Sequence, residues 1–313
     1  MFKTFEMELA GRPLIIETGK MAKQANGAVL VRYGDTAVLV ATTASKEPRE
    51  GTDFFPLTVD YEEKMYAVGK MPGGFLRREG RPGNSAILCA RLIDRPIRPL
   101  FDKRCRNDIH VVATVLSVDY DNAPELCGMI GASASIGISD IPWDGPIAGV
   151  RVGRVDGKYV INPTQEEMAA STMNVTVAGS EEAIMMVEGG AQEAPEEEVL
   201  DAIMFGHETI KEICRFQKKI IEEVGKEKRV LTFPEVPAEI EKDVEAFATE
   251  SLKKAIFDAD KLRRDGNIAA AKKAAMEHFA EIYPEHLSDV ADALDHLTKE
   301  IVRHTITNEG IRP

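Results

Sequence analysis

A glycine-flanked, arginine-rich loop is the densest chemical signal in this sequence. It spans Gly73–Pro82 and reads GGFLRREGRP. The glycines let the loop project, Phe75 offers a stacking face, and Arg77, Arg78 and Arg81 offer guanidinium forks that suit phosphate. An aromatic side chain beside arginines is what a gate for single-stranded nucleic acid requires, because stacking tolerates any base. The alternative is a solvated loop with a buried phenylalanine.

A second group of arginines follows in the segment RLIDRPIRPLF, residues 91–101. Arg91 and Arg95 stand four residues apart, on one face of a predicted helix, and Arg98 follows just past the end of that helix. If the three arginines converge and Asp94 is the only acid beside them, they repel one another unless an anion or further acidic side chains neutralise their charge. The spacing therefore predicts either an anion site or an intramolecular salt-bridge network.

The charge distribution separates this region from the rest of the chain. The formal net charge is −13, which argues against general affinity for nucleic acid. Between Lys70 and Arg106, however, there are ten basic and three acidic residues, so this window carries +7 and the remainder −20. A basic patch on an acidic protein indicates a localised anion site.

Length and composition fit a soluble protein of two domains. The chain has 313 residues, of which 44% are hydrophobic, and no stretch approaches the roughly 18 apolar residues of a membrane helix. The first residues carry several glutamates and no apolar segment, so we expect no secretory signal and no membrane association. The four cysteines show no paired spacing, which indicates reduced thiols in a cytoplasmic protein.

Short β-branched runs and turns alternate through the first two thirds of the sequence, which predicts an α+β fold. The predicted strands are 13–18, 28–32, 36–42, 54–61, 109–119, 174–178 and 183–187, with a hairpin over 150–160. Helices are expected at 86–94, capped by Asn84-Ser85 and ended by Pro96 and Pro99, at 124–138, and from about 194 to 224.

The composition changes around Phe233-Pro234-Glu235-Val236-Pro237. Beyond it, residues 240–305 are rich in Ala, Glu, Lys and Leu with few β-branched runs. We therefore predict a first domain over 1–228, a linker over 229–237, and an all-α domain over 238–313.

Several long segments resemble the first core of the polynucleotide phosphorylase family. They are DFFPLTVDY (53–61), FLRREGRP (75–82), RLIDRPIRPLF (91–101), MIGASA (129–134) and FGH (205–207). The resemblance runs from one end of the chain to the other. In this family two RNase PH-like cores are joined by a helical domain and followed by KH and S1 RNA-binding domains. The chain would hold the first core and the helical domain, and stop where the second core begins.

The resemblance implies an RNase PH-like core, of the ribosomal protein S5 domain 2-like fold, followed by an all-α domain. It implies the activity of a polyribonucleotide nucleotidyltransferase, a phosphorolytic 3′-to-5′ exoribonuclease that degrades single-stranded RNA to nucleoside diphosphates in mRNA turnover. Inorganic phosphate would be the co-substrate and Mg²⁺ the metal. The implied partners are single-stranded RNA, two further copies in a homotrimer, and an RNA-degradation complex.

It also implies roles for the arginine-rich segments. The loop with Phe75, Leu76, Arg77 and Arg78 is similar to the ring of aromatic and basic residues at the family's channel entrance, although Leu76 stands where an aromatic is often found. Arg91, Arg95 and Arg98 match a basic cluster near the phosphorolytic site, where the two cores meet.

The catalytic ligands of the family are missing from the matching positions. Where the catalytic core has a serine-rich phosphate loop, this sequence reads Ala123-Pro124-Glu125-Leu126. Where it has metal-binding aspartates near a strand, this sequence has Asn174 and Thr176, and hard cations prefer carboxylates. We therefore expect no complete catalytic site and no metal site in this chain, which would be inactive alone, with Mg²⁺ bound by the second core.

Two other functions stay open at this point. One is a non-catalytic RNA-binding subunit of a ring, and the other is a scaffold for protein interaction with the helical domain as docking surface. A second core carrying the serine loop and paired aspartates would distinguish the enzyme from both.

Overall fold

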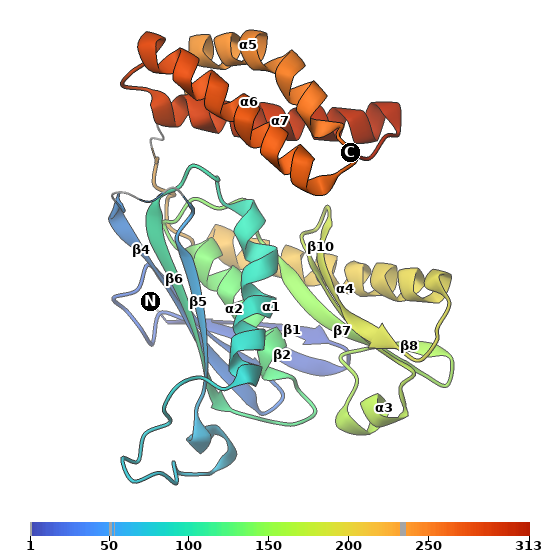
Figure 1. Cartoon of the computed structure of the whole chain (residues 1–313). Helices are drawn as coiled ribbons and strands as arrows, with labels where there is room; N and C mark the ends of the chain where they lie inside the picture. Colours follow the sequence, from blue (N-terminus) through green and yellow to red (C-terminus); the bar gives the residue numbers. More distant parts are fainter. Residues whose placement is uncertain (1, 50–51, 53, 232–235) are drawn as a thin grey trace. The chain divides into compact units, whose positions relative to one another are not determined.

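The computed structural model describes residues 2–49, 52, 54–231 and 236–313. They form two compact units, Met1–Thr232 and Phe233–Pro313 (Figure 1). Thr232, Phe233, Pro234 and Glu235 of the predicted linker lie outside the described residues. Among the helices that are described, none combines the length and the apolar character needed to cross a bilayer.

The first unit begins with a six-stranded sheet in the order β1-β2-β3-β4-β6-β5. Its strands are β1 Lys3–Leu9, β2 Arg12–Thr18, β3 Gly27–Tyr33, β4 Thr36–Pro48, β5 Leu57–Glu63 and β6 Asn107–Ser117. Neighbouring strands are antiparallel except for β5 and β6, which are parallel. Every second residue of β3 is buried, so one face of this sheet forms part of the core.

A second, antiparallel sheet has the order β10-β9-β7-β8. Its strands are β7 Ala148–Val155, β8 Lys158–Ile161, β9 Met173–Gly179 and β10 Ile184–Ala191, and a short helix, α3 Gln165–Ala170, connects β8 to β9. The long helix α4, Glu196–Val224, packs on β7 and β9. Acidic residues fill the first turn of α4, where they favour the positive end of the helix dipole.

Helix α2, Pro124–Ile138, lies between the two sheets and contacts β3, β4, β6 and β7 as well as α1 and α4 (Figure 1). Every residue from Leu126 to Ile138 is buried. Close packing requires small residues in α2. A Cβ on Gly131 would stand 2.5 Å from a methyl carbon of Val40, well inside van der Waals contact.

Helix α1 is longer than the sequence predicted. It covers Asn84–Ile97 and packs on β5, whereas we expected residues 86–94. Gly83 rather than Asn84-Ser85 occupies the N-cap position, and Ser85 Oγ bonds to Glu63 instead, at 3.2 Å. Pro96 lies inside the last turn of the helix, which continues for one more residue to Ile97, although proline provides no N–H for a helical hydrogen bond.

Other differences concern the edges of the strands. β1 and α3 were not predicted. β1 alternates half-buried and exposed side chains and has no apolar run that would indicate a strand. Residue 54 does not begin β5, which starts at Leu57. Pro56 precedes that strand and cannot donate to a ladder, although its carbonyl accepts a hydrogen bond from Ile109 N at 3.0 Å. The expected strand over 183–187 extends to Ala191.

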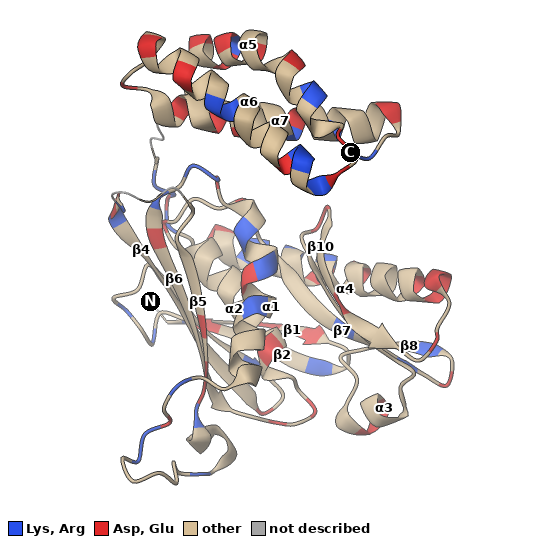
Figure 2. Cartoon of the chain, viewed as in Figure 1, with Lys and Arg blue, Asp and Glu red and all other residues tan. Residues whose placement is uncertain are grey.

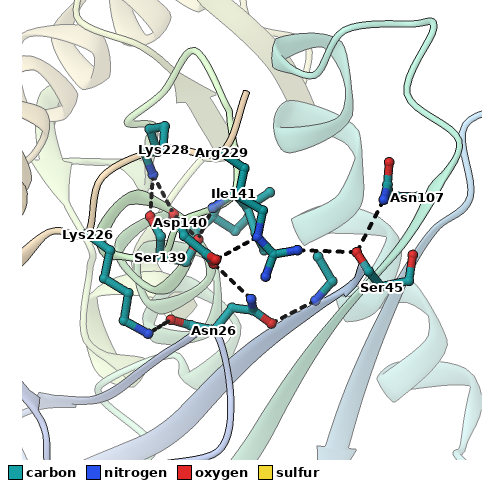
Figure 3. Close-up of polar contacts among 11 residues, drawn as sticks. Asn26, Ser45, Asn107, Ser139, Asp140, Ile141, Lys226, Lys228 and Arg229 are labelled. Carbon is teal, nitrogen blue, oxygen red and sulfur yellow. Dashed lines mark hydrogen bonds and ion pairs between the residues drawn. The ribbon is translucent and has the colours of Figure 1, made fainter. Parts of the chain in front are cut away.

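The segment after α4 is fastened to the C-terminal end of α2 (Figure 3). The Nζ of Lys228 donates to the carbonyl oxygens of Ile136, Gly137 and Ser139 at 2.8–3.2 Å. These carbonyls lie at the end of the helix, where partners within the helix run out. A lysine there satisfies them and also complements the negative end of the helix dipole.

The next residue continues this attachment. Arg229 Nε bonds to Asp140 Oδ2 at 2.6 Å, and its guanidinium also reaches the carbonyl oxygen of Ser45 at 3.3 Å. Asn26 donates to the other oxygen of Asp140 at 2.8 Å, and the pKa of Asp140 is lowered because these two donors outweigh its desolvation. Arg229, which the sequence analysis placed in the linker, is thus hydrogen-bonded to the first unit.

The second unit consists of α5 Ala238–Ile256, α6 Lys261–Ile282 and α7 Leu287–His304, followed by a π-helical turn, Thr305–Glu309. The helix α5 buries a residue at every fourth position, which is the helical period; these are Ile240, Val244, Ala248, Leu252 and Ile256. Phe279 of α6 and Leu294 of α7 belong to the same core. The expected all-α region is therefore three helices around one apolar core.

The attachment by Lys228 can be tested by stability. We expect Lys228→Met to lower the free energy of unfolding of the first unit by about 1–3 kcal/mol, because it leaves three helix-end carbonyls without their charged donor. Urea unfolding followed by circular dichroism measures this change. Lys226→Met is the matched control, since Lys226 Nζ donates to a single carbonyl, that of Asn26. Equal stability of the two variants would contradict the assigned role.

Candidate functional site

The arginine-rich loop connects a short 3₁₀ helix, Met65–Val68, to α1. Phe75 is fully exposed and Leu76 is 76% exposed. Arg77 N bonds to Gly74 O at 3.0 Å, and Arg77 adopts a φ of +51°, so the chain turns sharply at this point. A phenylalanine with its whole surface in water contributes nothing to the core and remains free to stack on a ligand.

The one acidic side chain of the loop does not neutralise its arginines. Glu79 Oε1 accepts a hydrogen bond from Met65 N at 2.9 Å, and Glu79 Oε2 lies 3.5 Å from Lys64 Nζ. Glu79 therefore fastens the base of the loop to the 3₁₀ helix.

The guanidinium groups of the loop consequently have no partner among the residues that the structure describes. Arg77, Arg78 and Arg81 are exposed, and within the part of the chain that the structure describes their side chains form no hydrogen bond or ion pair. Figure 2 shows basic residues along this loop and on α1.

The three arginines of the second segment do not converge on one site. Arg98 binds both carboxylate oxygens of Asp94, at 2.6 and 3.0 Å, and donates to the carbonyl oxygens of Phe55 and Leu57 at 3.2 and 3.0 Å. Its guanidinium also lies 5.7 Å from the centre of the Phe55 ring. These contacts join the end of α1 to the start of β5, so Arg98 has a structural role.

Arg95 and Arg91 have different surroundings. Arg95 forms an ion pair of 2.5 Å with Glu188 on β10. Arg91 is exposed and, among the described residues, its side chain has no polar partner. It lines a cavity of about 270 Å³ together with Asp60 and Tyr61. The sequence left an anion site and a salt-bridge network open; Arg95 and Arg98 are in ion pairs, whereas Arg91 is not.

The positions that lack catalytic ligands lie around one cavity of about 400 Å³. Glu125 comes from the first turn of α2, Asn174 and Thr176 from β9, and Arg151 from β7. Glu188 and two glycines of β10 and three residues of α1 complete the wall. The structure therefore brings together the segments that the sequence analysis considered as the phosphate and metal positions.

Ion pairs occupy the acidic side chains of this cavity. Arg151 binds Glu125 Oε1 at 2.6 Å, and Arg95 binds Glu188 at the rim. A phosphate at the N-terminus of α2 would face the Glu125 carboxylate, and Asn174 and Thr176 offer neutral oxygens where a divalent cation prefers carboxylates. Across the described residues there is no group of three or more His, Cys, Asp or Glu side chains able to hold a metal.

The one thiol in the cavity is not activated. Burial raises the pKa of Cys89 to about 12, and the nearby carboxylates of Glu125 and Glu63 act in the same direction. A thiol with this pKa remains protonated at neutral pH and is a poor nucleophile. The arrangement is thus balanced in charge and offers neither a phosphate site nor an activated nucleophile.

Arg151 and Glu188 were not predicted as site residues. The Glu188-Gly189-Gly190 segment resembles a turn in sequence, yet all three residues belong to β10. A Cβ on Gly189 would stand 2.3 Å from Asn174 O on the neighbouring strand, so glycine permits the two strands to approach. Arg151 and Arg154 are the two charged residues of β7, whose other residues are small or apolar, and a charged residue inside such a strand was the available signal for Arg151.

Comparisons with known proteins agree with this arrangement. Residues 10–142 match the family model "3′ exoribonuclease family, domain 1", and residues 145–209 match domain 2 of the same family. Residues 239–313 match the model "Polyribonucleotide nucleotidyltransferase, RNA binding domain".

Two curated relatives are similar over almost the whole chain. The polyribonucleotide nucleotidyltransferase of Heliobacterium modesticaldum is 55% identical over 311 residues, which are 99% of this chain and 44% of the relative. That of Syntrophomonas wolfei is 56% identical over 310 residues, again 99% of this chain and 44% of the relative. The chain thus spans less than half the length of these relatives.

A solved structure supports the fold. Rice (Oryza sativa) Rrp46 superposes with a TM-score of 0.53 at 15% identity, covering 71% of this chain and 94% of Rrp46. Together with the two matching domain models, this similarity confirms the expected RNase PH-like α+β core.

The different surroundings of the arginines on α1 lead to a direct test. We expect Arg98→Ala to lower the free energy of unfolding by about 1–3 kcal/mol, because it leaves Asp94 and two backbone carbonyls without their donor. Arg91→Ala, on the same helix, should change it by less than about 0.5 kcal/mol. Chemical denaturation of both variants provides the comparison, and a large loss for Arg91→Ala would show that this side chain is structural.

Proposed function

Because this chain belongs to the polyribonucleotide nucleotidyltransferase family, we propose that it is the RNA-admitting, structural first part of a phosphorolytic 3′-to-5′ exoribonuclease. In the proposed reaction, inorganic phosphate attacks the terminal 3′ phosphodiester of single-stranded RNA and releases a nucleoside diphosphate. The chemistry depends on positioning and on neutralising the charge of the phosphates. The catalytic residues would come from a second core outside this chain.

The observation that carries the proposal is the loop at Phe75–Arg81. It presents a fully exposed aromatic ring beside arginines that have no partner in the described part of the chain, while Glu79 bonds to the 3₁₀ helix at the base of the loop. Stacking and phosphate neutralisation are the two contributions that hold a single strand regardless of its sequence. We assign base stacking to Phe75 and phosphate contacts to Arg77, Arg78 and Arg81, with Leu76 as an apolar neighbour.

Arg91 is the best candidate for a contact nearer to the reaction. It is exposed and has no polar partner in the described chain, whereas Arg95 and Arg98 are held by acids. We propose that Arg91 offers its guanidinium to RNA or phosphate, while Arg95 and Arg98 fix the helix that carries it.

The ligands proposed for catalysis do not fit the cavity of this chain. Its carboxylates, Glu125 and Glu188, are neutralised by Arg151 and Arg95, so they leave no charge for Mg²⁺. We therefore propose that Mg²⁺ and phosphate act at the second core. The homotrimer, the cytoplasmic location and membership of an RNA-degradation complex are likewise proposals that follow from the family.

A non-catalytic RNA-binding subunit is the second candidate function. The Glu125–Arg151 pair favours it, because a cavity filled by an ion pair needs no catalytic role. The two candidates differ in what the complete protein does, since only the enzyme releases nucleoside diphosphates from RNA.

We expect no phosphorolysis by residues 1–313 alone. Incubation with poly(A), inorganic phosphate and Mg²⁺ should release no ADP, because the phosphate and metal ligands are absent from the cavity. Chromatography of the products measures the result, and the full-length relative from Heliobacterium modesticaldum is the positive control. ADP release that persists through repurification would refute the assignment of the catalytic ligands to a second core.

The loop is tested in the complete enzyme, where several copies can surround a channel. For single strands, each neutralised phosphate contributes roughly 0.7 to the slope of log affinity against log salt. Arg77→Ala with Arg78→Ala should therefore reduce this slope by about 1.4. Phe75→Ala should instead cost about 1–3 kcal/mol of binding free energy with little change in slope.

Fluorescence anisotropy with labelled oligoadenylate at several salt concentrations gives both quantities. Lys23→Ala with Lys219→Ala removes the same charge from exposed positions away from the loop and should leave the slope unchanged. If the double arginine variant retains both the affinity and the slope of the parent, the loop does not contact RNA.

A further inference from the structure

The helical unit is acidic except in one region. Residues 238–313 contain eleven basic and sixteen acidic residues. Seven of the basic residues but only three of the acidic ones fall between residues 253 and 273, which gives this stretch +4 and leaves −9 for the rest of the unit. Figure 2 shows blue segments gathered toward one end of α5 and α6. Such segregation restricts any polyanion to one part of the surface.

The basic corner is our name for the five cationic side chains where α5 ends and α6 begins: Lys253, Lys254, Lys261, Arg263 and Arg264. The three lysines are exposed, and in the described part of the chain their side chains have no hydrogen bond or ion pair. Their charges are therefore available to a ligand.

Two of the three acids in this stretch are used in local structure. The Asp260 side chain accepts a hydrogen bond from Arg263 N at 2.9 Å, which caps α6, and Asp258 accepts from Asp260 N at 3.0 Å. Arg263 lies 3.4 Å from Asp258 and 4.0 Å from Asp260, and Arg264 donates to the carbonyl oxygen of Asp258 at 3.3 Å. The third acid, Asp265, is exposed.

Helix stability does not account for all of these cations. Lys253 and Lys254 lie in the last turn of α5, where positive charge favours the helix dipole. Lys261, Arg263 and Arg264 lie in the first turn and a half of α6, where positive charge is unfavourable and acidic residues are preferred. The first turn of α6 contains no acidic residue. Because cations at this end of a helix lower its stability, their presence here indicates an anionic ligand.

An exposed aromatic ring lies within the corner. Phe257 directly follows α5 and is 44% exposed, and it stands between Lys254 and Lys261 in sequence. Leu262, in the first turn of α6, is 83% exposed. Basic side chains with an accessible aromatic ring are the combination that binds single-stranded nucleic acid.

We propose that the basic corner is a second contact site for single-stranded RNA, separate from the loop at Phe75–Arg81. Lys253, Lys254 and Lys261 bind phosphates, and Phe257 stacks on a base. The inference rests on the proposed function for the choice of RNA as the polyanion, and the matching RNA-binding family model supports that class of ligand. The model covers the whole unit, whereas the charge assigns the contact to one corner of it.

The experiment uses residues 1–313 and labelled oligoadenylate, with anisotropy measured over a range of salt concentrations. Lys253→Gln, Lys254→Gln and Lys261→Gln combined should reduce the slope of log affinity against log salt by about 2, if each lysine engages one phosphate. Phe257→Ala should weaken binding by roughly five- to 150-fold with little effect on the slope. Phe257→Tyr, which retains the ring, should restore affinity.

A matched triple variant controls for net charge. Lys23→Gln, Lys219→Gln and Lys242→Gln remove three exposed lysines outside the corner and should leave the slope as in the parent. An equal fall in both triple variants, or no fall in the corner variant, overturns the proposal. Thermal midpoints of all variants identify any loss of folding, and Phe257→Tyr then decides the role of the ring.

The Arg77→Ala, Arg78→Ala variant, measured beside these, separates the two proposals. If it lowers the slope while the corner variant does not, the corner is wrong and the loop contact stands. If the corner variant alone lowers the slope, the corner contact stands, and the loop assignment is decided by the measurement in the complete enzyme. RNA that does not bind the parent chain even at low salt rules out the corner as a contact of this chain.

Discussion

The burial of α2 between two sheets is the constraint on which the first unit depends. All residues from Leu126 to Ile138 are buried, and within the helix Ser133 Oγ accepts a hydrogen bond from Ile147 N at 2.9 Å and Ser135 Oγ lies 2.6 Å from Thr42 Oγ1. The two ends of the helix are held by further polar contacts from other elements. Glu125 at the N-terminal end pairs with Arg151 of β7, and the carbonyls at the C-terminal end accept hydrogen bonds from Lys228.

This constraint also explains the cavity beside α2. In a catalytic RNase PH-like core, the N-terminus of such a helix is suited to an anion, because its free N–H groups and its dipole attract negative charge. Here the side chain of Glu125 itself places a negative charge at this helix end, and Arg151 neutralises that charge. The same position therefore carries an ion pair between α2 and β7.

The distribution of acids decides which arginines are available for ligands. Asp94 forms an ion pair with Arg98, and Glu188 forms one with Arg95. Glu79 instead lies beside Lys64 and accepts a hydrogen bond from a backbone N–H, so it does not pair with the arginines next to it in the loop. In the helical unit, Asp258 and Asp260 are likewise used in capping. In both units, acids are occupied by local structure and neighbouring cations remain exposed, which is how an acidic protein can present sites for a polyanion.

The sequence by itself determined the secondary structure where a period or a turn signal was strong. The helix at 124–138 and the strands through 36–42 and 174–178 were predicted from apolar runs, and the α+β class followed from them. The family was inferred separately, from the resemblance of segments such as residues 75–82 and 91–101. It erred where local signals conflict with packing. Pro96 lies inside the last turn of α1 and does not end it, and the strand expected from residue 54 begins only at Leu57, after Pro56.

Only the tertiary structure decided the roles of individual charged residues. Arg91, Arg95 and Arg98 have the same chemistry and regular spacing, yet one is unpaired in the described chain, one binds Glu188 and one joins α1 to β5. The partner of Arg95 is 93 residues away in sequence, and that of Arg151 is 26 away. Ion pairs depend on distances of a few ångströms between segments that the fold brings together, and spacing along the chain carries no information about those distances.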